Sequence, residues 1–475
     1  AAWKALRQDL LKDVSALGLL QGDRTALRVL QEREEALRVT PSNSSFQQAK
    51  LASLLDLKGE HLEAKELLKG CSTSTCQPGE QAAIGFLQHL VLQHVRWQEE
   101  RAMITDTNSV AHIRHVPVET VSAQVSGEEI WERFVKPGIP CVVRGVRLAP
   151  LRTLDDLAPL GSVQIPMRRC NENSTNWAKL EADGMIRFDD FLETFIAPFQ
   201  QANQAPRNSP QLFDFSIWQH CATLGDQVLM PSKWFPVDLY TYASVKMQPI
   251  SGSAGPTLFV APAGSGSSLH VDTLQTNFWM FMCFGRKRWR LVSRDDLSLL
   301  HPRYLCDLNP VFPTDLNAFQ DGQTGKPRQL TIHEINLEAD DLIFVPAGWP
   351  HQVDNLETSV AMSANFIDAS NVQRCIEEAE VMATVEENPG LWAKVLRRAV
   401  AEDQLQRLRL SIEVEKLRSF KARHGEARPP AEVQRRILGL LSVTGLGLSV
   451  IGWWYFGNRK VEPKETFRHL TKITV

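Results

Sequence analysis

The first part of the chain carries Leu and Ala at spacings of three and four residues, with few runs of the kind that strands favour. Because an α-helix turns once every 3.6 residues, this spacing predicts a helical domain over residues 1–113. The same pattern returns later, where residues 371–434 are predicted to form a basic helical segment. Helical segments therefore flank the middle of the chain.

Between residues 114 and 370 the pattern changes to short apolar runs rich in β-branched and aromatic residues. The runs are bounded by Gly, Pro, Asp or Ser, and they read "TLFVAPA", "NFWMFMCF", "KRWRLV", "LIFVPA" and "SVAMSANFI". Short strands at such spacing are typical of a sandwich or barrel. The predicted fold class is therefore α+β, with a β core between an N-terminal helical domain and C-terminal helices.

Residues 437–457 form a stretch of 21 residues without a charged side chain, which is long enough to cross a bilayer. Trp453, Trp454 and Tyr455 at one end are typical of an interfacial aromatic belt. We predict one transmembrane helix within residues 435–475, and hence a membrane localisation; a buried core helix is the alternative. Six Lys or Arg precede the span within about 20 residues and five follow it, so its orientation and organelle stay open.

Composition limits the classes of protein further. A chain of 475 residues is longer than a single hydrophobic core usually organises, so two or three domains are expected. The net charge of -3 gives no reason to predict a nucleic-acid partner. Eight cysteines without a CxxC pair exclude a zinc ribbon and a dense disulfide framework.

The candidate chemistry begins with a His-x-Asp triplet at the start of a strand. Residues i and i+2 of a strand share a face, so His270 and Asp272 would point into the same space. A triplet of this kind is expected by chance about once in such a chain, usually as a surface pair. A third ligand is supplied by "DDLIFVPAGWPHQVDN", which presents His351 at the start of another strand. Two histidines and one carboxylate are typical of non-haem Fe(II) oxygenases, and zinc would tolerate the same set.

Lys287 is the second unusual position. In "GRKRWRLV", period two puts Lys287, Trp289 and Leu291 on one face and three arginines on the other, which we expect to face solvent. An inward, unpaired ammonium costs several kcal/mol, so Lys287 needs an anion such as the distal carboxylate of 2-oxoglutarate. A lysine that extends to the barrel rim is the alternative.

The last strand-like run also has a polar face. In "SVAMSANFI", Ser359, Ala361, Ser363 and Asn365 alternate with apolar residues. A polar cavity wall and plain solvent exposure explain this pattern equally well.

Taken together, these motifs resemble the JmjC, or cupin-like, 2-oxoglutarate oxygenases. The likeness covers roughly residues 114–370 and rests on "SGSSLHVDTLQTNFWMFMCFGRKRWRLV" and "FVPAGWPHQVDNLETSVAMSANFI". HxD, a lysine 17 positions after its His, a later His and an Asn 14 positions after that occur in the family's order. The resemblance implies a double-stranded β-helix (jelly-roll) core, with Fe(II), 2-oxoglutarate and dioxygen as cofactor and cosubstrates.

Residue by residue, the resemblance implies roles for six positions. The iron ligands, and so the catalytic residues, would be His270, Asp272 and His351. Lys287 would bind the cosubstrate, Ser267 stands at a hydroxyl position, and Asn365 matches a polar residue of the same pocket. Met280 departs from the Asn of some close relatives, which puts that one cosubstrate contact in doubt.

The function implied is an Fe(II)- and 2-oxoglutarate-dependent dioxygenase that acts on a protein substrate. An Asp rather than a Glu as middle ligand, and a membrane span, favour a side-chain hydroxylase over a demethylase. By analogy with the family, residues 371–434 would form a homodimer contact. Two alternatives are a metal-binding cupin without oxygenase activity and a membrane-anchored adaptor.

The helical domain holds one further resemblance. Residues 36–68 place Pro41 before one helix, Gly59 between two helices, and Ala52 and Ala64 where the helices would touch. This pattern resembles a tetratricopeptide unit, and a plain helical bundle explains it equally well.

Overall fold

The computed structural model describes residues 2–39, 44–72, 74, 76–104, 113–200, 205–240, 256–305, 308–317, 330–386 and 389–402. The chain divides into two units, Ala1–Leu396 and Arg397–Val475. The architecture below is that of the first unit.

The chain begins with a group of helices. They are α1 (Ala2–Leu10), α2 (Ala16–Gln21), α3 (Arg24–Val39), α4 (Ser45–Lys58), α5 (His61–Lys69) and α6 (Pro78–Ile104). The Ser15 side chain accepts from the Gly18 amide and caps α2, while Gly59 ends α4 with a positive φ of 91°. Ala52 and Ala64 are both buried in one core, as expected for paired helices. Pro41 lies outside the described residues, so the tetratricopeptide interpretation stays a prediction.

Two facing sheets form the middle of the chain. One has the order β1-β11-β10-β13-β8 and the other the order β2-β3-β12-β9-β14-β7-β6-β4-β5. The strands are β1 (Arg114–Pro117), β2 (Glu119–Ser122), β3 (Cys141–Arg144), β4 (Gln164–Cys170), β5 (Leu180–Arg187), β6 (Gln211–Ser216), β7 (Thr257–Ala261), β8 (Gly266–His270), β9 (Asn277–Phe284), β10 (Lys287–Val292), β11 (Thr331–Leu337), β12 (Asp341–Val345), β13 (His351–Asn355) and β14 (Ser359–Phe366).

Strands β7 to β14 alternate between the two sheets along the chain, except that the consecutive strands β10 and β11 pair within the smaller sheet. β8, β10, β11 and β13 belong to the smaller sheet, while β7, β9, β12 and β14 lie side by side in the larger one. This alternation produces a double-stranded β-helix, so the predicted cupin core is confirmed. The apolar residues between the sheets, among them Phe278, Trp289 and Ile343, form one buried cluster that closes the core.

Helices and turns cover the outer face of the larger sheet. They include α7 (Gly127–Ile130), α8 (Phe188–Phe191), α9 (Ala197–Gln200), α10 (Ile217–His220) and α11 (Ala222–Gly225). Phe134, Phe188, Leu224 and Trp234 pack with the sheet residues in a second buried cluster. The larger sheet is therefore buried on both faces, which explains the continuous apolar runs of β9 and β12.

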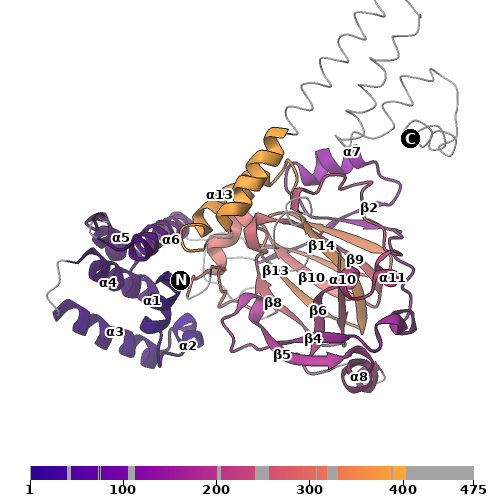
Figure 1. The fold of residues 1–475 in the computed structure, drawn as a ribbon, viewed down its shortest axis with the longest axis horizontal. Helices are drawn as coiled ribbons and strands as arrows, with labels where there is room; N and C mark the ends of the chain where they lie inside the picture. The colour runs from indigo at the N-terminus through magenta and orange to yellow at the C-terminus, as the bar shows by residue number, and fades with distance from the viewer. Residues whose placement is uncertain are drawn as a thin grey trace, which may run out of the picture. The chain divides into compact units, whose positions relative to one another are not determined.

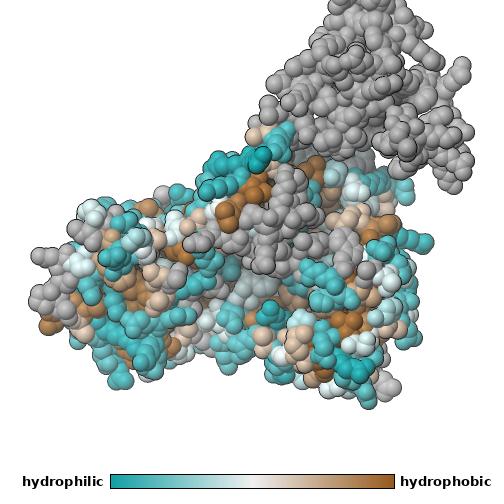
Figure 2. Space-filling model, in the orientation of Figure 1, coloured by the Kyte–Doolittle hydropathy of each residue, from teal (hydrophilic) through white to brown (hydrophobic). Residues whose placement is uncertain are grey.

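Helix α13 (Val372–Met382) and a helix over 389–402 follow the last strand. Figure 1 shows α13 beside α6, close to the strands. Ile376, Trp392 and Leu396 share a buried core with Trp3 and Leu87 of the N-terminal helices. Figure 2 shows mostly hydrophilic residues over the visible described surface, with smaller hydrophobic patches between them.

Among the described residues, no helix combines the length and the apolar character that a membrane crossing needs. The predicted span, residues 437–457, lies outside the described residues, as does most of the predicted basic segment 371–434. The structure therefore does not test either prediction.

Candidate metal centre

Register brings the two predicted histidines together. β8 ends at His270 and β13 begins at His351, and these residues face each other across the antiparallel pair. Their ring centroids lie 4.2 Å apart. Asp272 follows at the start of the 3₁₀ turn η5 (Thr273–Gln275). The three side chains thus meet at one edge of the smaller sheet, although they are far apart in sequence.

Hydrogen bonds fix which nitrogen of each ring carries the hydrogen. His270 Nδ1 lies 2.7 Å from the Ser268 carbonyl oxygen, and His351 Nδ1 lies 3.0 Å from the Trp349 carbonyl oxygen. Because a carbonyl oxygen can only accept, each Nδ1 must donate. In the neutral ring this leaves Nε2 with a free lone pair. Burial, and then the neighbouring His351, hold the pKa of His270 well below its ordinary value, which favours the neutral ring.

The free lone pairs converge on a carboxylate. Asp272 Oδ1 lies 4.0 Å from His270 Nε2 and 3.9 Å from His351 Nε2. Three acceptors in this arrangement have no hydrogen to share, so a cation is the partner that satisfies all of them. Burial also raises the pKa of Asp272, and a bound cation would offset the cost of burying its charge. The donor set therefore fits a divalent metal ion such as Fe(II).

Asn365 holds the carboxylate from the other side. Its amide nitrogen donates to Asp272 Oδ2 at 3.1 Å and contacts Thr276 Oγ1 at 2.8 Å. Asn365 lines a cavity, and Ser359, Ala361 and Ser363 of the same face are buried, so the polar face of β14 is not explained by plain solvent exposure. An outer amide of this kind orients a metal-binding carboxylate.

The turn before His351 depends on a glycine. Gly348 has a φ of 74°, and a Cβ at this position would lie 2.6 Å from Gln275 Oε1. Only glycine combines this backbone conformation with such a close approach. The turn is also tied to β9, because the Ala347 amide donates to Asn277 Oδ1 at 3.0 Å.

A cavity of about 590 Å³ opens between the sheets beside these ligands. Lys287, Ser267, Asn365 and Met280 line it, so the structure brings all of the predicted site residues to one space. Lys287 is 4% exposed, and burial lowers its pKa to about 7. Its position agrees with the predicted inward lysine rather than with one that reaches the rim.

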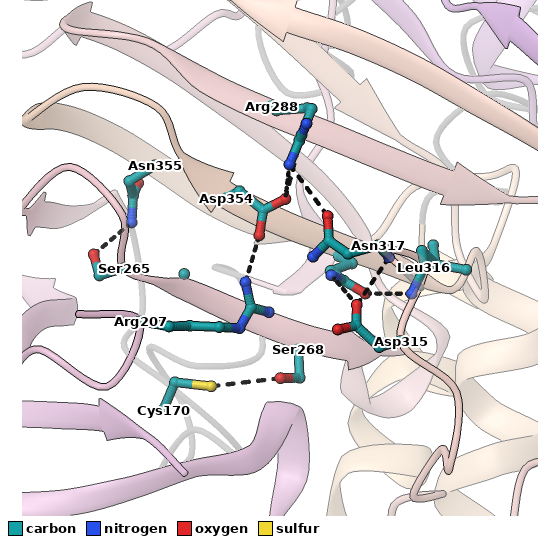
Figure 3. Close-up of polar contacts among 12 residues, drawn as sticks. Cys170, Arg207, Ser265, Ser268, Arg288, Asp315, Leu316, Asn317, Asp354 and Asn355 are labelled. Carbon is teal, nitrogen blue, oxygen red and sulfur yellow. Dashed lines mark hydrogen bonds and ion pairs between the residues drawn. The ribbon is translucent and has the colours of Figure 1, made fainter. Parts of the chain in front are cut away.

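Lys287 is held by a neutral amide rather than by an acid. Its ammonium donates to Asn355 Oδ1, which also accepts from the Ser359 hydroxyl at 3.1 Å. The Asn355 amide nitrogen donates to Ser265 Oγ at 2.9 Å, as Figure 3 shows. Among the described residues this arrangement fixes the ammonium but leaves its charge uncompensated. A carboxylate in the cavity would compensate it.

The prediction that the arginine face of β10 faces solvent is wrong for Arg290, whereas Arg286 and Arg288 are partly exposed. Arg290 is buried and donates to Asp354 of the neighbouring β13. Asp354 also accepts hydrogen bonds from Arg207 and Arg288, as Figure 3 shows. Burial alone would raise the pKa of Asp354, but the hydrogen bond from Arg207 and its positive charge, with Arg288, lower it. Loop residues cover this face and supply the additional partners. The alternation of residues along β10 therefore predicted correctly which side chains share a face, but it did not predict that Arg290 is buried.

Trp177, Asp214 and Asn355 also line the cavity, and the sequence reasoning missed all three. Trp177 packs edge-on against His270, with ring centroids 4.5 Å apart. Asp214 sits at an irregularity of β6 with a φ of 56°, and burial raises its pKa. Asn355 shares the period-two face of His351, a signal that could have found it. Trp177 and Asp214 belong to a region without a motif.

A second His₂Asp cluster lies in the helical domain. His61 Nδ1 and His94 Nδ1 lie 2.8 Å and 2.6 Å from Asp56 Oδ1, and Arg7 donates to Asp56 Oδ2 at 2.5 Å. Both rings donate directly to the carboxylate, and an arginine already balances its charge. This cluster is therefore a buried hydrogen-bonded ion pair, whereas the cluster around Asp272 offers three lone pairs.

Comparison with known proteins agrees with this geometry. The model of the cupin-like domain family matches residues 127–371, more than half of the chain. The chain is 25% identical over 289 residues to the human 2-oxoglutarate and iron-dependent oxygenase JMJD4, covering 54% of this chain and 63% of the relative.

Two other relatives match shorter stretches. The Arabidopsis thaliana arginine-specific demethylase JMJ22 is 31% identical over 126 residues, which are 25% of this chain and 24% of the relative. The Caenorhabditis elegans bifunctional arginine demethylase and lysyl-hydroxylase psr-1 is 26% identical over 184 residues, 34% of this chain and 41% of the relative. The chain thus spans less than two thirds of each of these relatives. Since the domain match covers most of both sheets and all three candidate ligands, this chain belongs to the cupin-like JmjC family.

Proposed function

We propose that this chain is an Fe(II)- and 2-oxoglutarate-dependent dioxygenase that hydroxylates a protein side chain. One observation carries the proposal: Nε2 of His270, Nε2 of His351 and Oδ1 of Asp272 converge as acceptors without a hydrogen between them. The relatives named as a 2-oxoglutarate and iron-dependent oxygenase and as a lysyl-hydroxylase support it.

The proposed division of roles follows the contacts. His270, Asp272 and His351 would hold the iron, and Lys287 would bind the far carboxylate of 2-oxoglutarate. Ser267, on β8 at the cavity wall, would offer its hydroxyl to the same cosubstrate. When bound, iron and 2-oxoglutarate supply the oxidation of a C–H bond by dioxygen, with release of succinate and carbon dioxide.

The chain's own residues perform the positioning. Asn365 keeps Asp272 turned toward the two histidines, and the carbonyls of Ser268 and Trp349 keep both Nε2 lone pairs exposed to the metal position. Phe278, Trp289 and other apolar side chains of the cavity wall exclude water from the reacting atoms.

The direct test is metal-dependent conversion of 2-oxoglutarate into succinate by the purified chain. We expect the wild type to form succinate with Fe(II), and Asp272→Ala to form none. An Asp272→Ala variant that keeps the wild-type rate would contradict the proposal. The Asp272→Ala chain can also serve to trap the substrate, and mass spectrometry of the trapped protein after exposure to active enzyme distinguishes an added oxygen from a lost methyl group.

We also propose that residues 437–457 anchor the chain in a membrane. The support is the sequence alone: 21 residues without a charge, followed closely by Arg459 and Lys460. Extraction of membranes at alkaline pH tests this, because a spanning chain stays in the pellet and a peripheral one is released.

A homodimer formed through the helices after β14 is a third proposal, and its support is the family resemblance. Light scattering on the purified chain measures the mass directly. A mass equal to one chain at micromolar concentration would contradict it.

A further inference from the structure

A second cavity lies away from the metal centre, where the helical domain meets the segment after β10. Its volume is about 450 Å³, within the range of small-molecule sites. Helix α6 supplies His94, Gln98 and Arg101, and the segment after β10 supplies His301 and Arg303. The walls are therefore rich in groups that bind anions.

Two arginines face this cavity with donors to spare. Arg101 donates to the Ser298 carbonyl oxygen at 3.1 Å, and Arg303 donates to the Leu57 carbonyl oxygen. A guanidinium group carries five N–H donors, so each arginine keeps several for another acceptor. Burial lowers the pKa of both arginines, which means that an anion beside them would relieve a real cost.

His94 provides an independent observation. The side chain is 98% buried, as its exposure is 2%, and among the described residues its Nε2 has no hydrogen-bond partner. Its Nδ1 donates to Asp56, so Nε2 of the neutral ring is an acceptor, and the His94 side chain forms part of the cavity wall. A buried acceptor without a donor is costly and calls for a ligand with a hydrogen to give.

A cation does not fit these walls. Asp56, the acid behind the cavity, already binds Arg7, His61 and His94. The titratable groups that line the cavity itself are two arginines and three histidines, and a metal ion would be repelled by the guanidinium groups.

We propose that this cavity binds a small oxyanion that carries a hydroxyl hydrogen, such as hydrogen phosphate or a phosphate monoester. Its charged oxygens accept from Arg101 and Arg303, while its hydroxyl donates to His94 Nε2. This cavity would bind the anion whether or not the chain is an oxygenase, because the candidate metal centre uses different residues.

Calorimetric titration of the full chain with inorganic phosphate tests the proposal, with sulfate as the matched ligand. Sulfate has the same shape but no hydrogen at neutral pH, so we expect one phosphate to bind per chain and sulfate to bind at least tenfold more weakly. Arg101→Gln removes a positive charge, and Gln98→Glu adds a negative charge at an exposed residue of the cavity wall. Each variant should weaken phosphate binding at least tenfold.

Two controls locate the anion. Gln93→Glu adds the same charge on another face of α6, and Lys287→Ala changes the other cavity; both should bind phosphate as the wild type does. Titration with a phosphate monoester such as glycerol phosphate shows whether the site accepts a substituted phosphate. Four results would overturn the proposal: no binding at millimolar phosphate, equal binding of sulfate, unchanged binding in Arg101→Gln and Gln98→Glu, or loss of binding in Lys287→Ala.

Discussion

Among the described residues that line the cavity beside the candidate metal ligands, Lys287 is a buried cation without an acidic partner. Its hydrogen-bond partner is the amide of Asn355, and burial lowers its pKa to about 7, compared with about 10.4 in water. A lysine with a lowered pKa favours the neutral amine in the folded state. The ligand-free protein should therefore gain stability as pH rises from about 7 toward 10.

The same lowered pKa predicts proton uptake when 2-oxoglutarate binds. At pH 8 most Lys287 side chains are neutral in the free protein, and the carboxylate of the ligand restores the ammonium. Calorimetry in buffers of different ionisation enthalpy, with Mn(II) in the metal site, should report uptake of most of one proton. Lys287→Arg should abolish this uptake, because guanidinium is charged throughout the range. Equal uptake in both chains would show that another group takes up the proton.

Asn365 should act through Asp272 on the metal. Removing its amide in Asn365→Ala deletes the 3.1 Å hydrogen bond to Asp272 Oδ2, and such outer contacts are worth about 10- to 100-fold in metal affinity. Titration with Mn(II) measures the change. Ser363→Ala, on the same strand but bonded to Thr257, should keep the wild-type affinity. A similar loss in both variants would point to a general effect on β14 instead.

At the scale of elements, the candidate metal centre depends on one turn. Gly348→Ala strains a backbone with a φ of 74° and places a methyl group 2.6 Å from Gln275 Oε1, so the Gln275 side chain, which belongs to η5 beside Asp272, must turn away. We expect a loss of about 1–3 kcal/mol in unfolding free energy together with weaker metal binding. Gly22→Ala is a matched control, because Gly22 has the same φ of 74° with open space around it. It should lower stability through backbone strain alone and leave metal affinity unchanged. Urea unfolding and Mn(II) titration measure the two effects separately.

The sequence predicted the elements of the core well, because their signals are local. The runs that begin at Asn277 and Lys287 are strands with the same bounds as predicted. His270 and Asp272 of the HxD triplet line the same cavity, as the sequence predicted. The sequence could not predict whether one face of a strand is exposed to solvent or covered by other parts of the chain. Arg290 looked like a solvent residue because its acids, Asp354 and Glu334, come from other strands.

The same limit explains the missed site residues. Trp177 reaches the metal centre only because the chain before β5 folds against β8, where its indole donates to the Val271 carbonyl oxygen at 2.9 Å. The position of Asp214 depends on an irregularity in the pairing of β6, and the periodicity of the sequence does not predict this irregularity. Such long-range placements are set by tertiary packing rather than by local patterns.

At the scale of the whole molecule, the N-terminal helices and the β core share apolar contacts. Trp97 of α6 stacks on Tyr304 from the segment after β10, and both belong to the buried cluster that contains Leu274 and Trp392. Neither part closes this cluster without the other, so we expect α6 and β9 to lose hydrogen-exchange protection at the same denaturant concentration. Exchange of α6 well before β9, measured by mass spectrometry of peptides, would show that the helical domain opens independently.

The central claim concerns which of two similar clusters holds a metal, and metal titration of matched variants tests it most directly. We predict that the wild type binds one Mn(II) or Fe(II) per chain, that Asp272→Ala binds none at that site, and that a His61→Gln chain binds as the wild type does. Loss of the metal in His61→Gln with retention in Asp272→Ala, or the absence of binding in the folded wild type, would contradict the account.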